Sequence, residues 1–136
     1  MNVSIHAMQN KWITSGAILA ALAVATGAFG AHALQALVSE KAIKTWETAV
    51  QYHIFHAIAL VVCGLLQQHA QPKKLQPAAG FFLMGLLLFS GSLYTMVLLQ
   101  AVGLTSYRWL GAITPFGGLA FITGWVLLAL SIRANR

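Results

Sequence analysis

Residues 46–68 read W-E-T-A-V-Q-Y-H-I-F-H-A-I-A-L-V-V-C-G-L-L-Q-Q. This segment is apolar enough to lie among lipid chains, yet it contains two histidines. At the period of an α-helix, one face collects small, polar and apolar side chains together: Ala49, His53, His56, Leu60, Cys63 or Gly64, and Gln67. Polar groups are costly to expose to hydrocarbon, so we predict that this face packs against other parts of the protein.

The composition of the whole chain indicates a membrane protein with a single domain, residues 1–136. Hydrophobic residues make up 59% of the 136 and charged residues 7%, whereas soluble domains carry roughly 25% charged residues. The net charge of +6 comes from basic residues scattered along the chain, which form no basic stripe for nucleic acid. We therefore expect membrane lipids as the acidic partners. The lone Cys63 can form no disulfide within the chain.

Four apolar runs are long enough to cross a bilayer core of about 30 Å at about 1.5 Å per residue. They cover residues 12–34, 47–68, 78–100 and 110–132. We predict an all-α membrane protein in which four transmembrane helices form an antiparallel bundle. A secretory signal peptide is a rival interpretation of the first run, which ends in the A-x-A form of a cleavage site. The run is, however, longer than the roughly 7–15 apolar residues of a signal core, and three more spans follow.

Helix boundaries are indicated by capping residues and prolines. Ser39 is a candidate N-cap for the second helix, and Glu40 and Lys44 form an i, i+4 pair in its first turns. The prolines of the polar segment 71–77 are expected to stop one helix and to start the next at residue 78. The pair Thr114-Pro115 is expected to cap the last helix, with the proline in its first turn, and the alternative is a kink at Pro115.

The basic residues predict the orientation of the chain. With four spans, five of them lie on the side of the termini (Lys11, Lys73, Lys74, Arg133 and Arg136) and three on the other side (Lys41, Lys44 and Arg108). The positive-inside rule then places both termini in the cytoplasm.

This topology brings the polar residues of the spans into the outer half of the bundle. We predict one polar cluster there with His56 at its centre, formed by His32, Thr48, Tyr52, His56, Ser90, Ser92, Tyr94 and Thr114. In the first span, small residues recur at helical spacing from residue 16 to residue 31 and make a face that another helix can approach closely. The glycines expected at helix contacts are Gly27, Gly30, Gly91, Gly117, Gly118 and Gly124.

Several roles are compatible with such a cluster. It can be a hydrogen-bonded knot that fixes helix packing, or a pocket in which Tyr94 or His56 holds the polar head of a lipid or quinone. Proton or small-solute permeation would use His56, whose imidazole titrates near neutral pH. A metal or haem site would use His53 and His56 with His32, but no cysteine cluster or carboxylate inside the membrane completes the ligand set, and we expect no cofactor.

Enzymatic catalysis is not expected. No nucleophile, base and orienting acid occur at an informative spacing, and the only carboxylates, Glu40 and Glu47, lie outside the membrane or at its surface. We expect the protein to act by binding or interaction.

Four short blocks occur in order within residues 13–132: Gly27-Ala28-Phe29-Gly30-Ala31-His32, then Thr48-Ala49 with Tyr52 and His56, then Phe89-Ser90-Gly91-Ser92-Leu93-Tyr94, then Thr114-Pro115 with Gly117, Gly118, Phe121, Gly124 and Trp125. Together they resemble the uncharacterised YgdD-like family of small bacterial inner-membrane proteins, catalogued as domain of unknown function 423. The resemblance implies a four-span protein of the bacterial inner membrane, and it supplies no established activity, substrate or catalytic residue. It also implies that residues such as Gln are accepted at position 53, which disfavours a metal pair of His53 and His56.

Small-residue faces on the first span and at Gly117 and Gly118 would permit self-association. Another copy of the chain or another membrane protein is therefore an expected partner besides lipid.

Overall fold

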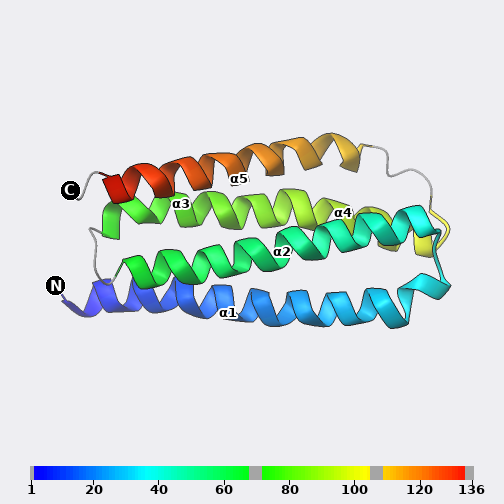
Figure 1. Ribbon diagram of the computed structural model, residues 1–136, viewed down its shortest axis with the longest axis horizontal. Helices are drawn as coiled ribbons and strands as arrows, with labels where there is room; N and C mark the ends of the chain where they lie inside the picture. The colour runs from blue at the N-terminus through cyan, green and yellow to red at the C-terminus, as the bar shows by residue number, and fades with distance from the viewer. Residues whose placement is uncertain (1, 68–71, 105–108, 134–136) are drawn as a thin grey trace.

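Four apolar segments form long helices that lie side by side, with neighbours in the chain running in opposite directions (Figure 1). The structure is a computed structural model, which describes residues 2–67, 72–104 and 109–133. The helices are α1 (Asn2–His32), α2 (Glu40–Leu66), α3 (Pro72–Gly85), α4 (Gly91–Ala101) and α5 (Leu110–Arg133). A short 3-10 turn, η1 (Leu34–Ala36), follows α1, and one turn of π-helix, η2 (Leu86–Ser90), joins α3 to α4 within the third segment.

These helices confirm the predicted four-span fold. Within the described residues, four helical segments are long and apolar enough to cross a membrane: Lys11–Ala36, Glu40–Leu66, Leu75–Ala101 and Leu110–Ile132. The shortest has 23 residues and is about 35 Å long, which exceeds a bilayer core of about 30 Å. The start of α1 and the end of α5 lie at the same end of the bundle, here called the terminal end (Figure 1). The opposite end, where α2 and α5 begin, is called the Ser39 end.

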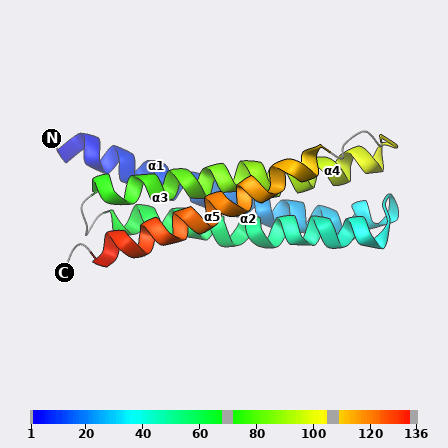
Figure 2. The ribbon, with the colours of Figure 1, turned by 90° about the horizontal axis from the view of Figure 1, so that it is seen from above.

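The helix α2 is the centre of the packing. It packs along α1 on one side and against α3, η2 and α4 on the other, while α5 packs along α3 and crosses the other helices obliquely (Figure 2). The predicted interior face of α2 is buried throughout, at Ala49, His53, His56, Leu60, Cys63, Gly64 and Gln67. The prediction that this face meets protein and not lipid is confirmed.

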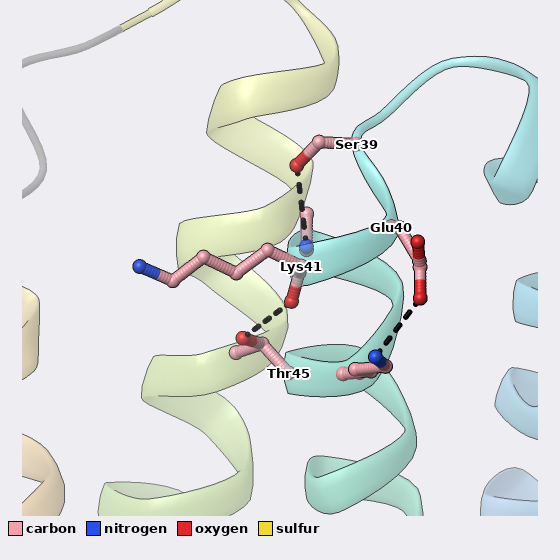
Figure 3. Close-up of polar contacts among 6 residues, drawn as sticks. Ser39, Glu40, Lys41 and Thr45 are labelled. Carbon is pink, nitrogen blue, oxygen red and sulfur yellow. Dashed lines mark hydrogen bonds and ion pairs between the residues drawn. The ribbon is translucent and has the colours of Figure 1, made fainter.

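The start of α2 also follows the sequence signals. The backbone N–H of Ala42 donates to the Ser39 hydroxyl oxygen at 3.3 Å, so Ser39 is the N-cap (Figure 3). Glu40 and Lys44 form an exposed ion pair at 2.9 Å one turn apart, which is worth at most a few tenths of a kcal/mol.

The expectations about prolines were wrong in two places. Helix α3 begins at Pro72, not at residue 78, and Pro77 lies inside it. Likewise α5 begins at Leu110, so Thr114 is not a cap and Pro115 lies inside the helix. Membrane helices tolerate proline where neighbouring helices hold the chain in place, and the Thr114 hydroxyl is indeed bonded to a residue of α4.

Small residues of α1 allow close contact with α2, as predicted. A Cβ atom added at Gly16 would lie 2.7 Å from the carbonyl oxygen of Ala57, and one at Gly30 would lie 2.5 Å from the Trp46 ring. The contact at Gly27 is looser, at 3.4 Å from a side chain of α2. The face of small residues is therefore used within the chain.

The glycines of the other helices divide into tight and loose positions. A Cβ at Gly117 would collide with the backbone of Phe89, and one at Gly124 would lie 2.7 Å from an aromatic ring of α3. At Gly91 and Gly118 the nearest atoms would be 3.7 and 3.9 Å away, which is ordinary contact. Gly117 and the α1 face, on which self-association was expected to rest, are thus occupied inside one molecule.

Candidate functional site

His56 lies in a cage of aromatic rings between α2, α3 and α5. Its Nδ1 atom is 2.7 Å from the carbonyl oxygen of Tyr52, and its Nε2 atom is 3.2 Å from the indole nitrogen of Trp125. The ring stacks on Phe121 with centroids 3.5 Å apart and planes 12° apart. A carbonyl accepts only and an indole donates only, so these contacts fit a neutral imidazole with its proton on Nδ1. Both nitrogens are satisfied.

A groove of about 330 Å³ opens beside this cage. It is lined by Gln51, Tyr52, Phe55, His56 and Trp125. Three of the lining side chains are aromatic and well exposed, with exposed fractions of 40% for Tyr52, 59% for Phe55 and 47% for Trp125. The Tyr52 hydroxyl and the Gln51 amide make no hydrogen bond with any residue that the structure describes, so both are free to bind a ligand.

A second set of polar groups joins α1, α2 and α4. The Tyr94 hydroxyl lies 3.1 Å from Nδ1 of His53 and 3.1 Å from the hydroxyl of Thr26. The indole N–H of Trp46 donates to the Thr26 carbonyl at 2.8 Å. Trp46 also packs against the Tyr94 ring, with centroids 4.6 Å apart. This set fixes the three helices relative to one another.

Two serines of the third segment make a further pair of ties. The hydroxyl of Ser90 donates to the Ala49 carbonyl of α2 at 3.0 Å. The hydroxyls of Ser92 and Thr114 lie 2.7 Å apart and join α4 to α5. Neither tie reaches the ring of His56 through the hydrogen bonds of the described residues.

Comparison with known proteins gives the family. A family described as "Protein of unknown function (DUF423)" matches residues 26–118. The chain is 41% identical over 121 residues to the UPF0382 membrane protein YwdK of Bacillus subtilis, which covers 88% of this chain and 94% of the relative. It is 40% identical over 120 residues to the UPF0382 membrane protein SH2409 of Staphylococcus haemolyticus, covering 88% and 93%. The chain belongs to the DUF423 family.

Membership confirms the resemblance seen in the sequence, and no solved structure matches this DUF423 chain. The two relatives are named as membrane proteins, which agrees with four helices of membrane-spanning length and composition. Neither the family description nor these names states an activity.

The structure distributes the predicted site residues of the DUF423 chain over separate sets, where we expected one cluster. Tyr52 and His56 lie at the groove, and Ser90, Ser92, Tyr94 and Thr114 form ties between helices. Two residues lie apart from these sets. His32 is exposed at the end of α1, and the Thr48 hydroxyl is exposed and bonds only to its own helix, at the Lys44 carbonyl.

Six residues of the groove and the ties were missing from the predicted cluster: Thr26, Trp46, Gln51, His53, Phe55 and Trp125. Thr26 had a usable signal, because it is a polar residue one turn from Ala23 and Gly30 on the small-residue side of the first span. Trp125 had none beyond the family resemblance, because nothing in its own span shows which residue of α2 it faces.

The two histidines of α2 do not converge on one point. His53 is bonded to Tyr94 of α4, while His56 is bonded to Trp125 of α5. No three His, Cys, Asp or Glu side chains come together as a metal site in the part of the chain that is described.

Proposed function

We propose that this chain is a non-catalytic binding protein of the bacterial inner membrane, with both termini in the cytoplasm. Its polar ties hold the four helices as a rigid frame, and the groove beside His56 takes a lipid-soluble ligand. The observation that carries the proposal is the pair of free polar groups, Gln51 and Tyr52, on the wall of an otherwise aromatic groove. Apolar pockets with a few well-placed polar groups are typical of ligand sites.

The groove favours a ligand with an acceptor oxygen on an apolar body. The Tyr52 hydroxyl and the Gln51 amide both have hydrogens to donate. The exposed rings of Phe55 and Trp125 offer flat apolar surface for an acyl chain or a ring. The ester carbonyl of a membrane lipid meets both requirements, and a quinone carbonyl offers the same acceptor.

Permeation of protons or solutes is less well supported. The hydrogen-bond sets of the described residues end on backbone carbonyls, at Ala23, Ala49 and Tyr52. Chains of hydrogen bonds that end on backbone carbonyls do not continue as a path across the membrane. The geometry therefore favours binding over transport.

Native mass spectrometry of protein extracted in mild detergent tests the proposal. We expect the wild-type protein to retain one molecule whose mass identifies it as a phospholipid or a quinone. Tyr52→Phe removes the free hydroxyl and keeps the ring, so it should reduce the retained fraction by about tenfold, the value of one hydrogen bond of about 1.4 kcal/mol.

Thr48→Val is the matched control, because it removes a hydroxyl one turn away that bonds only to its own helix. It should leave the retained fraction unchanged. The proposal fails if the wild-type protein retains neither kind of molecule, or if Tyr52→Phe and Thr48→Val retain as much as the wild type.

A further inference from the structure

A second cavity lies between α1 and the third segment, with α2 behind it. Its volume is about 160 Å³, and its lining includes four leucines, a histidine and a serine: Leu19, Leu83, Leu86, Leu87, His53 and Ser90. Leu87 is 68% exposed, so the cavity is bordered by a side chain at the surface of the bundle. We call this cavity the His53 crevice. It contains none of the residues that line the groove beside His56.

The hydrogen bonds around His53 run in one direction. The Thr26 hydroxyl donates its single hydrogen to the Ala23 carbonyl at 3.0 Å, so towards Tyr94 it can only accept. The Tyr94 hydroxyl must then donate to Thr26, and towards His53 it can only accept. Nδ1 of His53 is therefore the donor of the third bond and carries a proton.

This direction fixes the chemistry of the other ring nitrogen. In a neutral imidazole with its proton on Nδ1, Nε2 is an acceptor. Nε2 of His53 makes no hydrogen bond within the described residues, although the side chain is only 7% exposed and lines the crevice. In an apolar environment an acceptor without a partner is costly, and a ligand that donates a hydrogen bond would remove that cost.

Depth and size restrict the ligand further. His53 is the middle residue of the span Glu40–Leu66, and Leu87 is next to the middle residue of the span Leu75–Ala101. A charged lipid head group is excluded from this depth by its cost in hydrocarbon. An apolar cavity of about 150 Å³ is large enough to hold one benzene ring, and the crevice has a similar volume of about 160 Å³.

We propose that the His53 crevice binds the ring of a lipid-soluble quinol, whose hydroxyl group donates a hydrogen bond to Nε2 of His53. The isoprenoid tail would leave the crevice past Leu87 into the bilayer. The oxidised quinone lacks the hydroxyl hydrogen, so the site distinguishes the reduced from the oxidised form. The site does not depend on the groove beside His56, because the two have no lining residue in common.

The test is an anaerobic titration of the protein in lipid nanodiscs, followed by tryptophan fluorescence. The probes are a short-tailed benzoquinol, the matching benzoquinone and the dimethyl ether of the quinol. We expect the quinol to bind about tenfold or more tightly than the other two, which is the value of one hydrogen bond. In protein labelled with nitrogen-15 at histidine, the Nε2 resonance of His53 should move with the quinol only.

Two leucine variants test the crevice without changing its hydrogen bonds: one narrows its mouth, and the other is the control. Leu87→Phe fills the mouth of the crevice and should lower the quinol affinity about tenfold or more, whereas Leu98→Phe, at an exposed residue of α4 outside the crevice, should not change it. His53→Phe should lose the preference for the quinol. Equal binding of the three probes to the wild type, absence of quinol binding, or unchanged binding in Leu87→Phe would overturn the proposal. Retention of a phospholipid that depends on Tyr52 is a separate result, so the two proposals can fail independently.

Discussion

At His56 a polar side chain is accommodated among apolar ones because each of its nitrogens finds the partner that its protonation requires. The Tyr52 carbonyl and the Trp125 indole supply one acceptor and one donor. The stacked ring of Phe121 covers one face of the imidazole, so the residue packs like an aromatic side chain of the core. We infer that His56 ties α2 to α5 and forms the inner wall of the groove.

A double-mutant cycle measures this tie. His56→Phe and Trp125→Phe each remove one partner and keep a ring in place, so the two losses should not add. We expect a coupling free energy of about 0.6 kcal/mol and at most about 1.7 kcal/mol, as for other hydrogen bonds between membrane helices. The measurement is reversible unfolding in mixed micelles, followed by circular dichroism.

Trp109→Phe serves as the control for that cycle. Trp109 is 63% exposed and directly precedes α5, more than four helical turns from Trp125, and should show no coupling to His56→Phe. Additive losses for His56 and Trp125 would show that the 3.2 Å contact contributes nothing to stability.

The sequence predicts one buried face of α2 but not the residues that this face meets. The buried face from Ala49 to Gln67 follows from helical period and polarity alone. The partners of His53 and His56 depend on how far each helix is rotated and shifted along its neighbour, which no single span records. The sequence therefore does not predict that His56 meets Trp125, or that Tyr94 joins His53 to Thr26.

Among the elements, the third span differs most from its expected form. Residues 78–100 are mostly apolar and predict one regular helix, but Leu86–Ser90 form a π-helical turn. Such a turn inserts one residue into the helix, so the side chains before it and after it point in different directions around the helix axis. Turns of π-helix often occur at functional sites. Here it places Ser90 against the Ala49 carbonyl and brings Leu86, Leu87 and Ser90 to the His53 crevice. A run of leucines gives no local signal for it.

Close packing between η2 and α5 is tested at two adjacent glycines. In Gly117→Ala the new methyl group would collide with the Phe89 backbone, which cannot move aside as a side chain can. We expect a loss of about 1–3 kcal/mol in the free energy of unfolding, as for other overpacked sites.

Gly118→Ala is the matched variant, with its nearest atom at 3.9 Å. It should be neutral or should stabilise the protein by up to about 1 kcal/mol, because alanine favours the helix more than glycine does. Unfolding in mixed micelles gives both values. Similar effects of the two substitutions would contradict the close approach of α5 to η2.

The four spans of the described residues place both ends of the molecule on the same side of the membrane. Which side that is follows from the distribution of basic residues. Both ends of the described chain lie at the terminal end (Figure 1). Three of the basic residues that favour a cytoplasmic position of this end, Lys73, Lys74 and Arg133, belong to α3 and α5. The Ser39 end instead carries Lys41 and Lys44, and Glu40 neutralises one of these charges through its ion pair with Lys44. This difference leads us to propose that the terminal end faces the cytoplasm.

Cysteine labelling in whole cells decides the direction of insertion. In a Cys63→Ala background, whose native thiol is buried, we would introduce Gln35→Cys at the Ser39 end and Gln76→Cys near the terminal end, both at exposed residues. A membrane-impermeant maleimide should label residue 35 in intact cells and residue 76 only after the cells are opened, since the excess of basic residues holds the terminal end inside. Labelling of both in detergent-extracted protein controls for reactivity.

The opposite pattern in intact cells would reverse the insertion and would place the Ser39 end, with its exposed ion pair, in the cytoplasm. The packing of the helices would not change, but the groove beside His56 and the His53 crevice would then be approached from the other leaflet.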